Sequence, residues 1–530
     1  MIKIFPRMLL DLNSLPDDFV LTKHVRCLPK SILHRVVMSL PDGKLRDALK
    51  AEVCKNYLSP LEQRRAVRDD LWDLKDEPLF RELFSSDWKM SQYEALVKDV
   101  KELLDLVSPT MCLSKWNEVT INLARSGSHS CCRTPLEIAD LDEVKVFPIA
   151  IHNSTVKKKS RHQMLSGERP PECHQCWTVE DSSKHVSNRI LLSINHVKDF
   201  YKILRSGLGD DYAPTQVELY STSTCQLKCF YCGPLYSSAW RQELLEESSY
   251  KLQHGVMFEI KPTSSVTNLD PFVVGYEKAI KEWYPSLRTL RFTGGEPLLA
   301  THTWRMLDYA KENPSPELTI SINSNLCVGQ KRIERLKKKL HELHGKVKEV
   351  WIHASGEATG DQMGYIRFGA NYSRWLENID DILSNTPNSV KVTVMNTVNI
   401  LCYDTFVKLV SDLLNLRKKY GDRLVLMSFK YLVSPKFSDV KLLPDSLKTS
   451  FLDELKGLLE KKSDHPYQTG SLTESEIYSL KRLIEHVQLP QVDTEIIDLK
   501  KFFKEYDRRR GTSFVKTFPR LAKEIKYETD

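Results

Sequence analysis

The chain has 530 residues, of which 41% are hydrophobic and 28% charged, as is ordinary for a globular protein of about two to four domains. Its formal net charge of +7 is small for this size, so charge alone neither requires nor excludes a nucleic-acid partner. We find no signal-peptide pattern and no apolar run of membrane-spanning length, and we expect a cytoplasmic protein without a membrane segment. The 12 cysteines are clustered, which favours metal sites over a disulfide framework.

Residues 1–108 form the first predicted region, which we expect to be mainly helical. Its clearest element is SQYEALVKDVKELLDLV (91–107), in which Ser91 and Glu94 are spaced as a capping box. Apolar residues recur on one helical face of this segment, and we interpret them as a packing face. They are Tyr93, Leu96, Val97, Val100, Leu103, Leu104 and Val107.

Residues 109–213 are predicted to form a loop-rich, metal-binding module. Two cysteines flank a glycine with the spacing C-x14-G-x4-C, and a C-x2-C pair follows about forty residues later. Four such thiols can complete the coordination of either a cubane iron–sulfur cluster or a zinc ion, and geometry does not separate the two. The candidate ligands are Cys112, Cys132, Cys173 and Cys176, with Cys131 able to replace its neighbour. The basic run VKKKSRHQ (156–163) is interpreted as solvated surface.

Residues 214–440 alternate predicted strands with helical segments. This pattern predicts a parallel sheet with right-handed crossovers, either open or curved into a partial barrel. In both cases the chemistry is expected at the carboxyl ends of the strands. The predicted strands are 216–222, 287–293, 318–324, 347–355, 390–398 and 423–433. Residues 441–530 are predicted to be a helical extension, whose charged run KKFFKEYDRRRG (500–511) is interpreted as a solvated helix face.

Three cysteines follow directly on the first predicted strand, in STSTCQLKCFYCGP (221–234). Cys225, Cys229 and Cys232 are spaced C-x3-C-x2-C, so a short loop can direct three thiolates at one iron–sulfur cube. A cubane cluster needs four ligands, so three thiols leave one iron open, which is typical of a catalytic site. A zinc site, or a half-site shared with other cysteines, is the alternative from spacing alone.

The second predicted strand ends in RFTGGEPLL (291–299). Gly294 and Gly295 allow a close backbone approach and positive φ, and Pro297 then fixes the chain direction. Alone, this motif indicates only a turn.

Together, CQLKCFYC (225–232) and the Gly-Gly-Glu-Pro turn resemble the radical S-adenosylmethionine superfamily, including an aromatic residue, Tyr231, before the last cysteine. The resemblance implies that Cys225, Cys229 and Cys232 hold a [4Fe-4S] cluster whose open iron binds S-adenosyl-L-methionine. Reductive cleavage then gives a 5′-deoxyadenosyl radical that abstracts hydrogen from a substrate. The implied fold class is α/β, a partial (β/α)6 TIM-like barrel with an N-terminal iron–sulfur module and additional helical segments at both ends.

The resemblance also implies which residues bind the cofactor. The Gly-Gly-Glu-Pro turn would hold the methionine amino group, and Ser355 and Arg367 its carboxylate, because a forked cation suits a carboxylate. Asn325 and Asn396 would line the ribose or adenine pocket. Structural alternatives are an arginine that only packs, a helix-capping serine and ordinary strand-end hydrogen bonds. The predicted set is Tyr231, Gly294, Gly295, Glu296, Pro297, Asn325, Ser355, Arg367 and Asn396.

The C-x14-G-x4-C spacing resembles the auxiliary-cluster modules called SPASM and twitch, although those modules follow the barrel and these cysteines precede it. Three further segments together resemble a twitch-domain group: CHQCWTVEDSSKHVSNR (173–189), GYIRFGANYSRW (364–375) and EYDRRRGTSFVKTFP (505–519). This resemblance covers roughly residues 109–520 and leaves residues 1–108 unmatched. It implies one auxiliary [4Fe-4S] cluster on Cys112, Cys132, Cys173 and Cys176, with structural zinc or free thiols as alternatives.

Three hypotheses for the function follow. The first is radical modification of a peptide or protein residue, with a reductant such as flavodoxin or ferredoxin. The second is radical dehydrogenation or epimerisation of a sugar or nucleotide-like small molecule. The third is a non-catalytic iron–sulfur or zinc protein that binds nucleic acid, for which the lysine-rich segment 331–348 speaks and the intact cysteine motif speaks against. Cys327 and Cys402 follow predicted strands and could return a hydrogen atom, although small buried residues are the ordinary interpretation.

Overall fold

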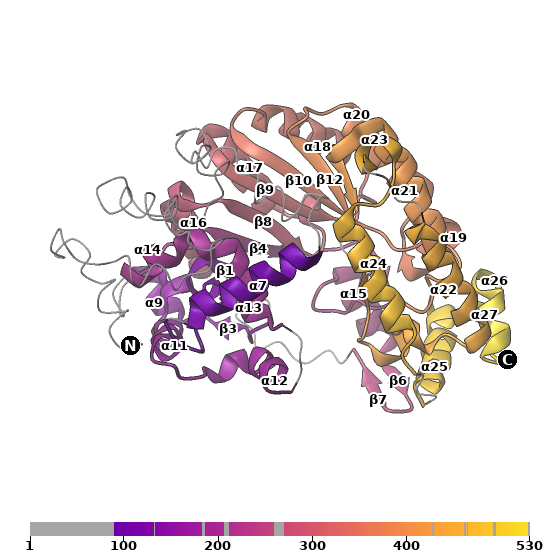
Figure 1. Ribbon diagram of the computed structural model, residues 1–530. Helices are drawn as coiled ribbons and strands as arrows, with labels where there is room; N and C mark the ends of the chain where they lie inside the picture. The colour runs from indigo at the N-terminus through magenta and orange to yellow at the C-terminus, as the bar shows by residue number, and fades with distance from the viewer. Residues whose placement is uncertain are drawn as a thin grey trace, which may run out of the picture. The chain divides into compact units, whose positions relative to one another are not determined.

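The computed structural model describes most of residues 90–527 (Figure 1). The described ranges are 90–105, 107–131, 133–182, 186–205, 211–258, 270–426, 429–460, 463, 465–490 and 494–527. The chain divides into two compact units: residues 1–218 with 268–287 form unit 1, and residues 219–267 with 288–530 form unit 2. Almost all of the predicted region 1–108, and also Cys132, lie outside the described residues. Among the described helices, none combines the length and apolar character that crossing a membrane requires.

Unit 1 contains the helix predicted around residues 91–107. The helix α7 spans Met90–Asp105, and its side chains Val100, Leu103 and Leu104 are buried, which confirms this part of the packing face. The side chains of the expected capping box lie outside the described residues.

The rest of unit 1 contains three antiparallel strands and several helices. Strand β1 (Glu118–Asn122) pairs with β2 (Gly127–His129), and β2 pairs with β3 (Glu137–Ile138). At Gly127 a Cβ would stand 2.5 Å from the backbone oxygen of Glu137, so a glycine is needed where β3 approaches. The helices are α8 (Ser114–Asn117), α9 (Leu141–Val146), α10 (Ala150–Asn153), α11 (Thr155–Leu165), α12 (His174–Ser182), α13 (Asn188–Ser193), α14 (Phe200–Arg205) and α16 (Asp270–Trp283). This module is therefore more helical than its predicted loop-rich character.

The basic run 156–163 lies on α11, and its interpretation as solvated surface is wrong for one face of that helix. Lys157 and Arg161 are only 4% and 3% exposed. Arg161 donates to Asn153 Oδ1 (2.8 Å) and to the backbone oxygen of Lys115 (3.0 Å). These oxygens satisfy the guanidinium, which is the condition for burying a charge.

Unit 2 is built around six of the described strands, which stand in the sheet in their chain order. Neighbouring strands from β8 to β14 pair in parallel. Beyond the end of β4, the backbone bonds from Gly295 N–H to Thr222 O and from Glu296 N–H to Thr224 O advance in the same direction along both segments, so β4 is parallel to β8. The strands are β4 (Gln216–Thr222), β8 (Thr289–Gly294), β9 (Ser315–Ser324), β10 (Val347–Ser355), β12 (Val390–Met395) and β14 (Leu424–Leu426). The predicted alternation of strands and helices is confirmed, with the last strand shorter than expected.

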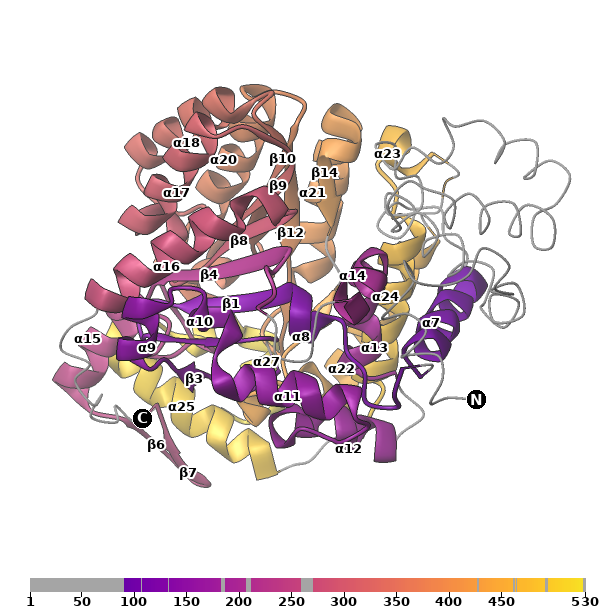
Figure 2. The same ribbon diagram turned by 90° about the vertical axis from the view of Figure 1, so that its left-hand side faces the viewer.

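The two faces of this sheet differ in polarity because side chains alternate along each strand. One face carries fully buried apolar side chains. The helices α17 (Thr301–Glu312), α18 (Gln330–Leu343) and α20 (Tyr372–Ser384) lie together on one side of the strands (Figure 2). Examples of the buried apolar side chains are Leu290, Phe292, Ile320, Ile322, Val350, Ile352, Val392 and Val394. The other face, which we call the polar face, carries Arg291, Ser321, Asn323, Trp351, His353 and Thr393 in register. A polar face on a parallel sheet is unusual, because such sheets are normally apolar on both sides.

The C-terminal extension is helical, as predicted. It contains α22 (Asp445–Leu459), α23 (Pro466–Thr469), α24 (Glu474–Val487), α25 (Thr494–Arg510), α26 (Phe514–Thr517) and α27 (Pro519–Glu524). The charged run 500–511 is not simply a solvated face, because the side chains of Arg509 and Arg510 are 2% and 0% exposed. Their guanidinium groups lie over the rings of Tyr250 (4.0 Å) and Tyr506 (3.8 Å). Aromatic faces therefore replace water around these cations.

A buried ion pair ties the extension to the sheet. Arg417, on α21 (Phe406–Tyr420), donates to both carboxylate oxygens of Glu476 on α24, at 2.9 and 2.5 Å, and both side chains are almost fully buried. The same carboxylate accepts the backbone N–H groups of Leu426 in β14 and of Thr473.

We expect Glu476→Ala to lower the free energy of unfolding by about 3–5 kcal/mol, because it leaves the buried Arg417 cation unpaired. Denaturant unfolding followed by circular dichroism measures the change. Glu474→Ala is the matched control, since Glu474 lies in the same first turn but is exposed. Equal losses in the two variants would contradict this account.

Candidate functional site

The loop that carries Cys225, Cys229 and Cys232 lies between β4 and α15 (Ser238–Glu247) in unit 2; we call residues 225–232 the cysteine loop. Its backbone oxygens are held by the start of α15. The bonds are Ala239 N–H to Cys225 O (3.3 Å), Ser237 Oγ–H to Leu227 O (2.7 Å) and Trp240 Nε1–H to Cys229 O (2.8 Å). The helix start thus fixes the backbone from which the three thiols project.

Two of the three sulfur atoms receive hydrogen-bond donors. Asn325 Nδ2 lies 3.7 Å from Cys225 Sγ, and an Arg367 guanidinium nitrogen lies 3.8 Å from Cys229 Sγ. Burial raises the pKa of all three thiols, that of Cys225 to about 11, so the protein alone holds them protonated. Donors aimed at sulfur suit thiolate ligands, and their number and placement tune an iron–sulfur centre. The donor set therefore fits the predicted cluster.

The two glycines of the Gly-Gly-Glu-Pro turn (residues 294–297) lie against the residues that lead into the cysteine loop. Gly294 has φ +117°, and a Cβ on it would stand 2.4 Å from Thr222 O. A Cβ on Gly295 would stand 2.4 Å from Thr224 O. Only glycine permits this approach, so the two predicted motifs adjoin at the ends of neighbouring strands.

The carboxylate of Glu296 is used within the protein. It is fully buried and accepts hydrogen bonds from Asn325 N–H (2.8 Å), Ser324 Oγ–H (2.9 Å) and Leu298 N–H (3.1 Å). Burial raises its pKa to about 7. Glu296 therefore ties the end of β8 to Asn325, whose amide reaches Cys225, while Pro297 begins a short 3-10 helix, η6 (Pro297–Leu299).

Arg367 belongs to a buried cluster that sequence analysis did not anticipate. Its Nε donates to Glu357 Oε2 (2.8 Å), and Tyr231 donates its hydroxyl to Glu357 Oε1 (2.5 Å). Arg367 is also the backbone partner of Cys229, where β5 (Lys228–Cys229) pairs with β11 (Arg367–Phe368). Glu357 lies two residues beyond the end of β10 (Val347–Ser355), but nothing in the sequence marked it as the partner of both side chains. The Arg367 cation, the Tyr231 hydroxyl and the Cys229 sulfur thus share one buried environment.

The remaining predicted cofactor residues lie at strand ends. Ser355 ends β10 opposite Met395. Asn396 donates from Nδ2 to Gly356 O (2.5 Å), and its buried Oδ1 has no hydrogen-bond partner among the described residues. This acceptor would suit an N–H group of a bound molecule. Cys327 is partly exposed, whereas Cys402 is fully buried.

Polar side chains continue from these strand ends along the polar face. Arg291 donates from Nε to Asn323 Oδ1 (3.1 Å). His353 is 7% exposed, and no described residue bonds to its Nδ1. Burial, and then the charge of Arg291, lower the pKa of His353 to about 3, so this imidazole is neutral near pH 7.

In unit 1, four thiols from three segments line one small cavity, which we call the thiol cavity. The cysteines are Cys112, Cys131, Cys173 and Cys176. The predicted Cys132 lies outside the described residues, and its neighbour Cys131 lines the cavity. Burial raises the pKa of Cys112 and Cys176, and that of Cys173 to about 12. Thiols are the ligand type of a fully ligated iron–sulfur cluster and of a structural zinc ion.

Two buried cations border the thiol cavity. Lys115 pairs with Glu172 (2.7 Å), and Arg189 pairs with Glu180 (2.8 Å) and donates to Met111 O. Across the described ranges, no three His, Cys, Asp or Glu side chains lie close enough together to hold a single metal ion. The fit of both thiol sets to a metal group therefore rests on their donor chemistry.

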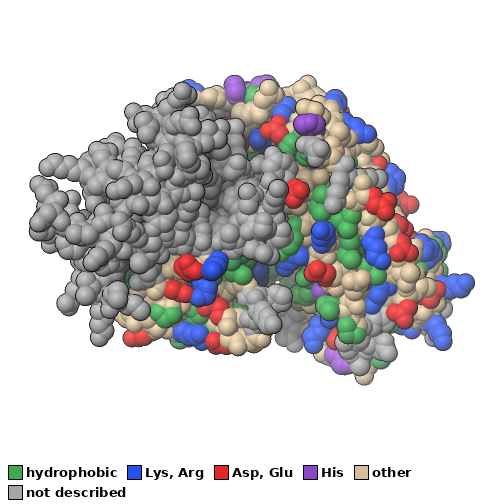
Figure 3. Space-filling model, viewed as in Figure 1, with side chains coloured by type: hydrophobic (Ala, Val, Ile, Leu, Met, Phe, Trp, Pro, Cys, Tyr) green, Lys and Arg blue, Asp and Glu red, His purple; other side chains and the backbone are tan. Residues whose placement is uncertain are grey.

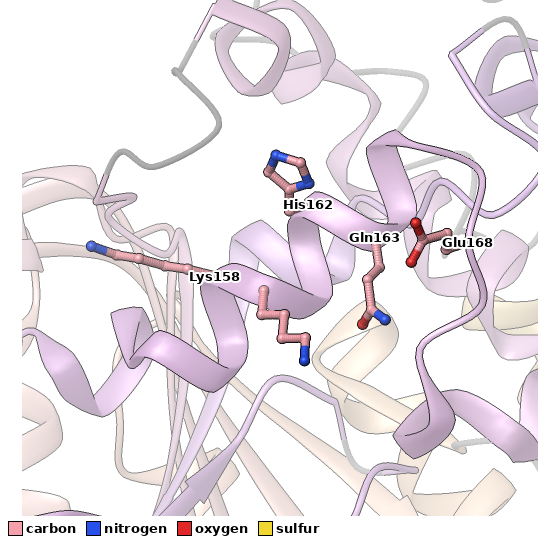
Figure 4. Close-up of a pocket in the computed structure, with 5 residues that line it drawn as sticks. Lys158, His162, Gln163 and Glu168 are labelled. Carbon is pink, nitrogen blue, oxygen red and sulfur yellow. The ribbon is translucent and has the colours of Figure 1, made fainter.

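A shallow depression on α11 carries no comparable chemistry (Figure 4). Its lining side chains, Lys158, Lys159, His162, Gln163 and Glu168, point in different directions. Lys158 is paired with Asp211 (2.6 Å). We interpret this part of α11 as ordinary surface.

No protein-family profile matches the chain, and no curated protein sequence matches it. The crystal structure of Streptococcus suis SuiB bound to precursor peptide SuiA matches with 14% identity and a TM-score of 0.31, over 64% of this chain and 66% of that chain. The crystal structure of Streptococcus suis SuiB matches with 12% identity and a TM-score of 0.26, over 58% and 59%. The chain thus spans less than two thirds of the length of these proteins, and at this similarity they carry no argument about its activity.

We expect stability to fall on acidification through His353. Between the ordinary pKa of 6.5 and about 3 the unfolded chain binds the proton and the folded chain does not, so each pH unit costs up to about 1.4 kcal/mol. The free energy of unfolding of His353→Gln minus that of the parent protein should therefore be larger at pH 5 than at pH 7.5. Denaturant unfolding at both pH values measures this, with exposed His344→Gln as the control. A parent-to-variant difference that does not change with pH would contradict the assignment.

Proposed function

We propose that this chain is a radical S-adenosylmethionine enzyme, in which Cys225, Cys229 and Cys232 hold a [4Fe-4S] cluster with one open iron. The observation that supports this most is the direct backbone contact between the segment entering the cysteine loop and the Gly-Gly-Glu-Pro turn, through Gly295 N–H and Thr222 O (2.6 Å). The chain-order arrangement of six parallel strands supports a sheet curved into a partial (β/α)6 barrel.

The residues around the cysteine loop have the following roles in this proposal. Cluster and cofactor, when bound, supply a 5′-deoxyadenosyl radical by reductive cleavage of S-adenosyl-L-methionine. Asn325 and Arg367 hold the sulfur atoms of Cys225 and Cys229, and Glu357 keeps the Arg367 cation in place. The backbone of the glycine turn, Ser355 and Asn396 bind the cofactor at the strand ends, where Asn396 offers its unused Oδ1.

We further propose one auxiliary [4Fe-4S] cluster in unit 1, on Cys112, Cys173, Cys176 and either Cys131 or Cys132. The presence of four cysteines in the lining of the thiol cavity supports it, and zinc is the alternative. An electron source such as flavodoxin or ferredoxin belongs to the same proposal.

The substrate we propose is a peptide or protein residue, with a small sugar or nucleotide-like molecule as the second candidate. Either would be presented at the polar face, where Arg291 and the neutral His353 offer charge and hydrogen bonding. Nucleic-acid binding is less favoured. Lys337 and Lys339 of the lysine-rich helix α18 pair with Asp381 and Asp308, and acidic and basic side chains are interspersed on the described surface in Figure 3.

We expect Cys225→Ala, Cys229→Ala and Cys232→Ala each to abolish 5′-deoxyadenosine release, because each removes one of three ligands of the cluster. The assay uses anaerobically purified full-length protein with dithionite and S-adenosyl-L-methionine, followed by chromatography. Cys402→Ala is the control, since this fully buried thiol is not one of the three proposed ligands. Release that survives in the three variants, or that never occurs in the iron-loaded parent protein, would rule out the assignment.

We expect Cys173→Ala to lower bound iron from about eight to about four atoms per chain while 5′-deoxyadenosine release persists, since each cubane cluster holds four irons. Metal analysis with parallel zinc determination measures this. Cys131→Ala and Cys132→Ala, compared side by side, identify the fourth ligand, because only the true ligand should reproduce the loss. Unchanged iron together with loss of one zinc per chain would replace the auxiliary cluster by a structural zinc site.

A further inference from the structure

The last turn of α25 contacts the backbone of the cysteine loop. The Arg510 guanidinium donates to Lys228 O (3.1 Å), in the peptide that enters Cys229, and to both carboxylate oxygens of Glu243 on α15 (3.0 and 3.1 Å). Its side chain is 0% exposed. One buried cation thus connects the C-terminal helix, the cysteine loop and the helix that follows this loop.

The same helix also contacts Phe230, the residue that follows Cys229. Phe230 is fully buried, and its ring lies 5.3 Å from that of Phe503 and 6.4 Å from that of Phe502, both on α25. Residues 228 and 230 are therefore both held by α25, and Cys229 lies between them. Fixing the backbone on both sides of a residue restricts the direction of its side chain.

The strand that pairs with Cys229 is held as well. Tyr506 on α25 donates its hydroxyl to Tyr365 O, and the Arg510 guanidinium lies over the Tyr506 ring (3.8 Å) and the Phe368 ring (5.2 Å). Tyr365 lies two residues before Arg367 of β11, and Phe368 lies directly after it. Arg367 is the residue whose guanidinium contacts Cys229 Sγ. Both strands of the β5–β11 pair thus depend on α25.

The hydrogen bonds made from position 510 require an arginine side chain. Glu243 also accepts from Lys228 Nζ (2.6 Å) and from the Tyr250 hydroxyl (2.8 Å). Only a forked, planar cation can engage both oxygens of this carboxylate and still reach a backbone oxygen. A lysine at this position would keep the charge and lose part of this geometry.

We propose that Arg510 is a positioning residue for the cluster ligand Cys229, so that the C-terminal helix is part of the machinery of the cluster site. The inference rests on the proposed function, because it assigns Arg510 a purpose at that site. The contacts by which Arg510 holds the cysteine loop involve protein atoms only, so they exist in the metal-free protein too.

The first test is hydrogen exchange of metal-free, full-length protein, read on peptides covering residues 225–232. In Arg510→Lys we expect exchange there to be about tenfold faster or more, as the loss of a hydrogen bond from a charged donor implies. The matched control is Arg508→Lys, because Arg508 is two residues away and 55% exposed, and it pairs with Glu505 and Glu247 at the surface. Exchange in Arg510→Lys equal to that in Arg508→Lys would overturn the inference.

The second test reads the loaded site in the same variants and in Arg510→Met. We expect an altered electron paramagnetic resonance spectrum and a shifted midpoint potential of the reduced cluster in both position-510 variants, and parent values in Arg508→Lys. Parent spectra and potentials with full iron content would overturn the inference. If Arg510→Met does not fold, Arg510→Lys decides. A parent protein without any iron–sulfur signal would overturn the proposed function, and the exchange test on metal-free protein keeps the two failures apart.

Discussion

The hydrogen bonding of the cysteine loop to the start of α15 is the constraint on which the rest of the site depends. Only the short β5–β11 pair gives this loop regular backbone partners, and unpaired backbone oxygens in a partly buried segment are costly. The side chains of Ser237 and Trp240 and the backbone of Ala239 supply the missing donors. Because these donors occupy the backbone, the sulfur atoms are left to interact with Asn325, Arg367 and the proposed metal group.

Around this loop, the site is built from buried ion pairs. Arg367 pairs with Glu357, and Arg510 pairs with Glu243. A buried pair contributes little net stability compared with well-packed apolar residues, yet losing one partner is expensive. Such pairs therefore act mainly to hold one arrangement. Here the Arg367 pair contacts a cysteine sulfur, and the Arg510 pair contacts the loop backbone.

Local sequence patterns predicted the elements well. The six strands of unit 2 have runs of apolar and β-branched residues between helical segments, and they occur where expected because both signals are local. The cysteine spacing and the glycine pair were readable for the same reason. The structure adds that a Cβ at Gly294 would clash with Thr222 O, a contact between segments about seventy residues apart.

Long-range pairing was not readable from the sequence. Glu357, Glu243 and Arg510 gave no signal of their own, because each acquires its role from partners more than a hundred residues away or on another element. The charged runs were wrongly interpreted for a related reason. Their composition indicated solvent exposure, whereas the side chains of Lys157, Arg161 and Arg510 donate to oxygen atoms inside the protein. The choice between Cys131 and Cys132 depends on the direction of adjacent side chains, which spacing cannot specify.

The bond between Arg510 and Lys228 joins residues 282 positions apart in the chain. A ribosome adding about 5–20 residues per second needs roughly 15–60 s to travel that distance. During this interval the cysteine loop has been synthesised, but the helix α25 that contacts it has not. The metal group proposed for this loop would therefore meet an unsupported segment until residue 510 has been synthesised.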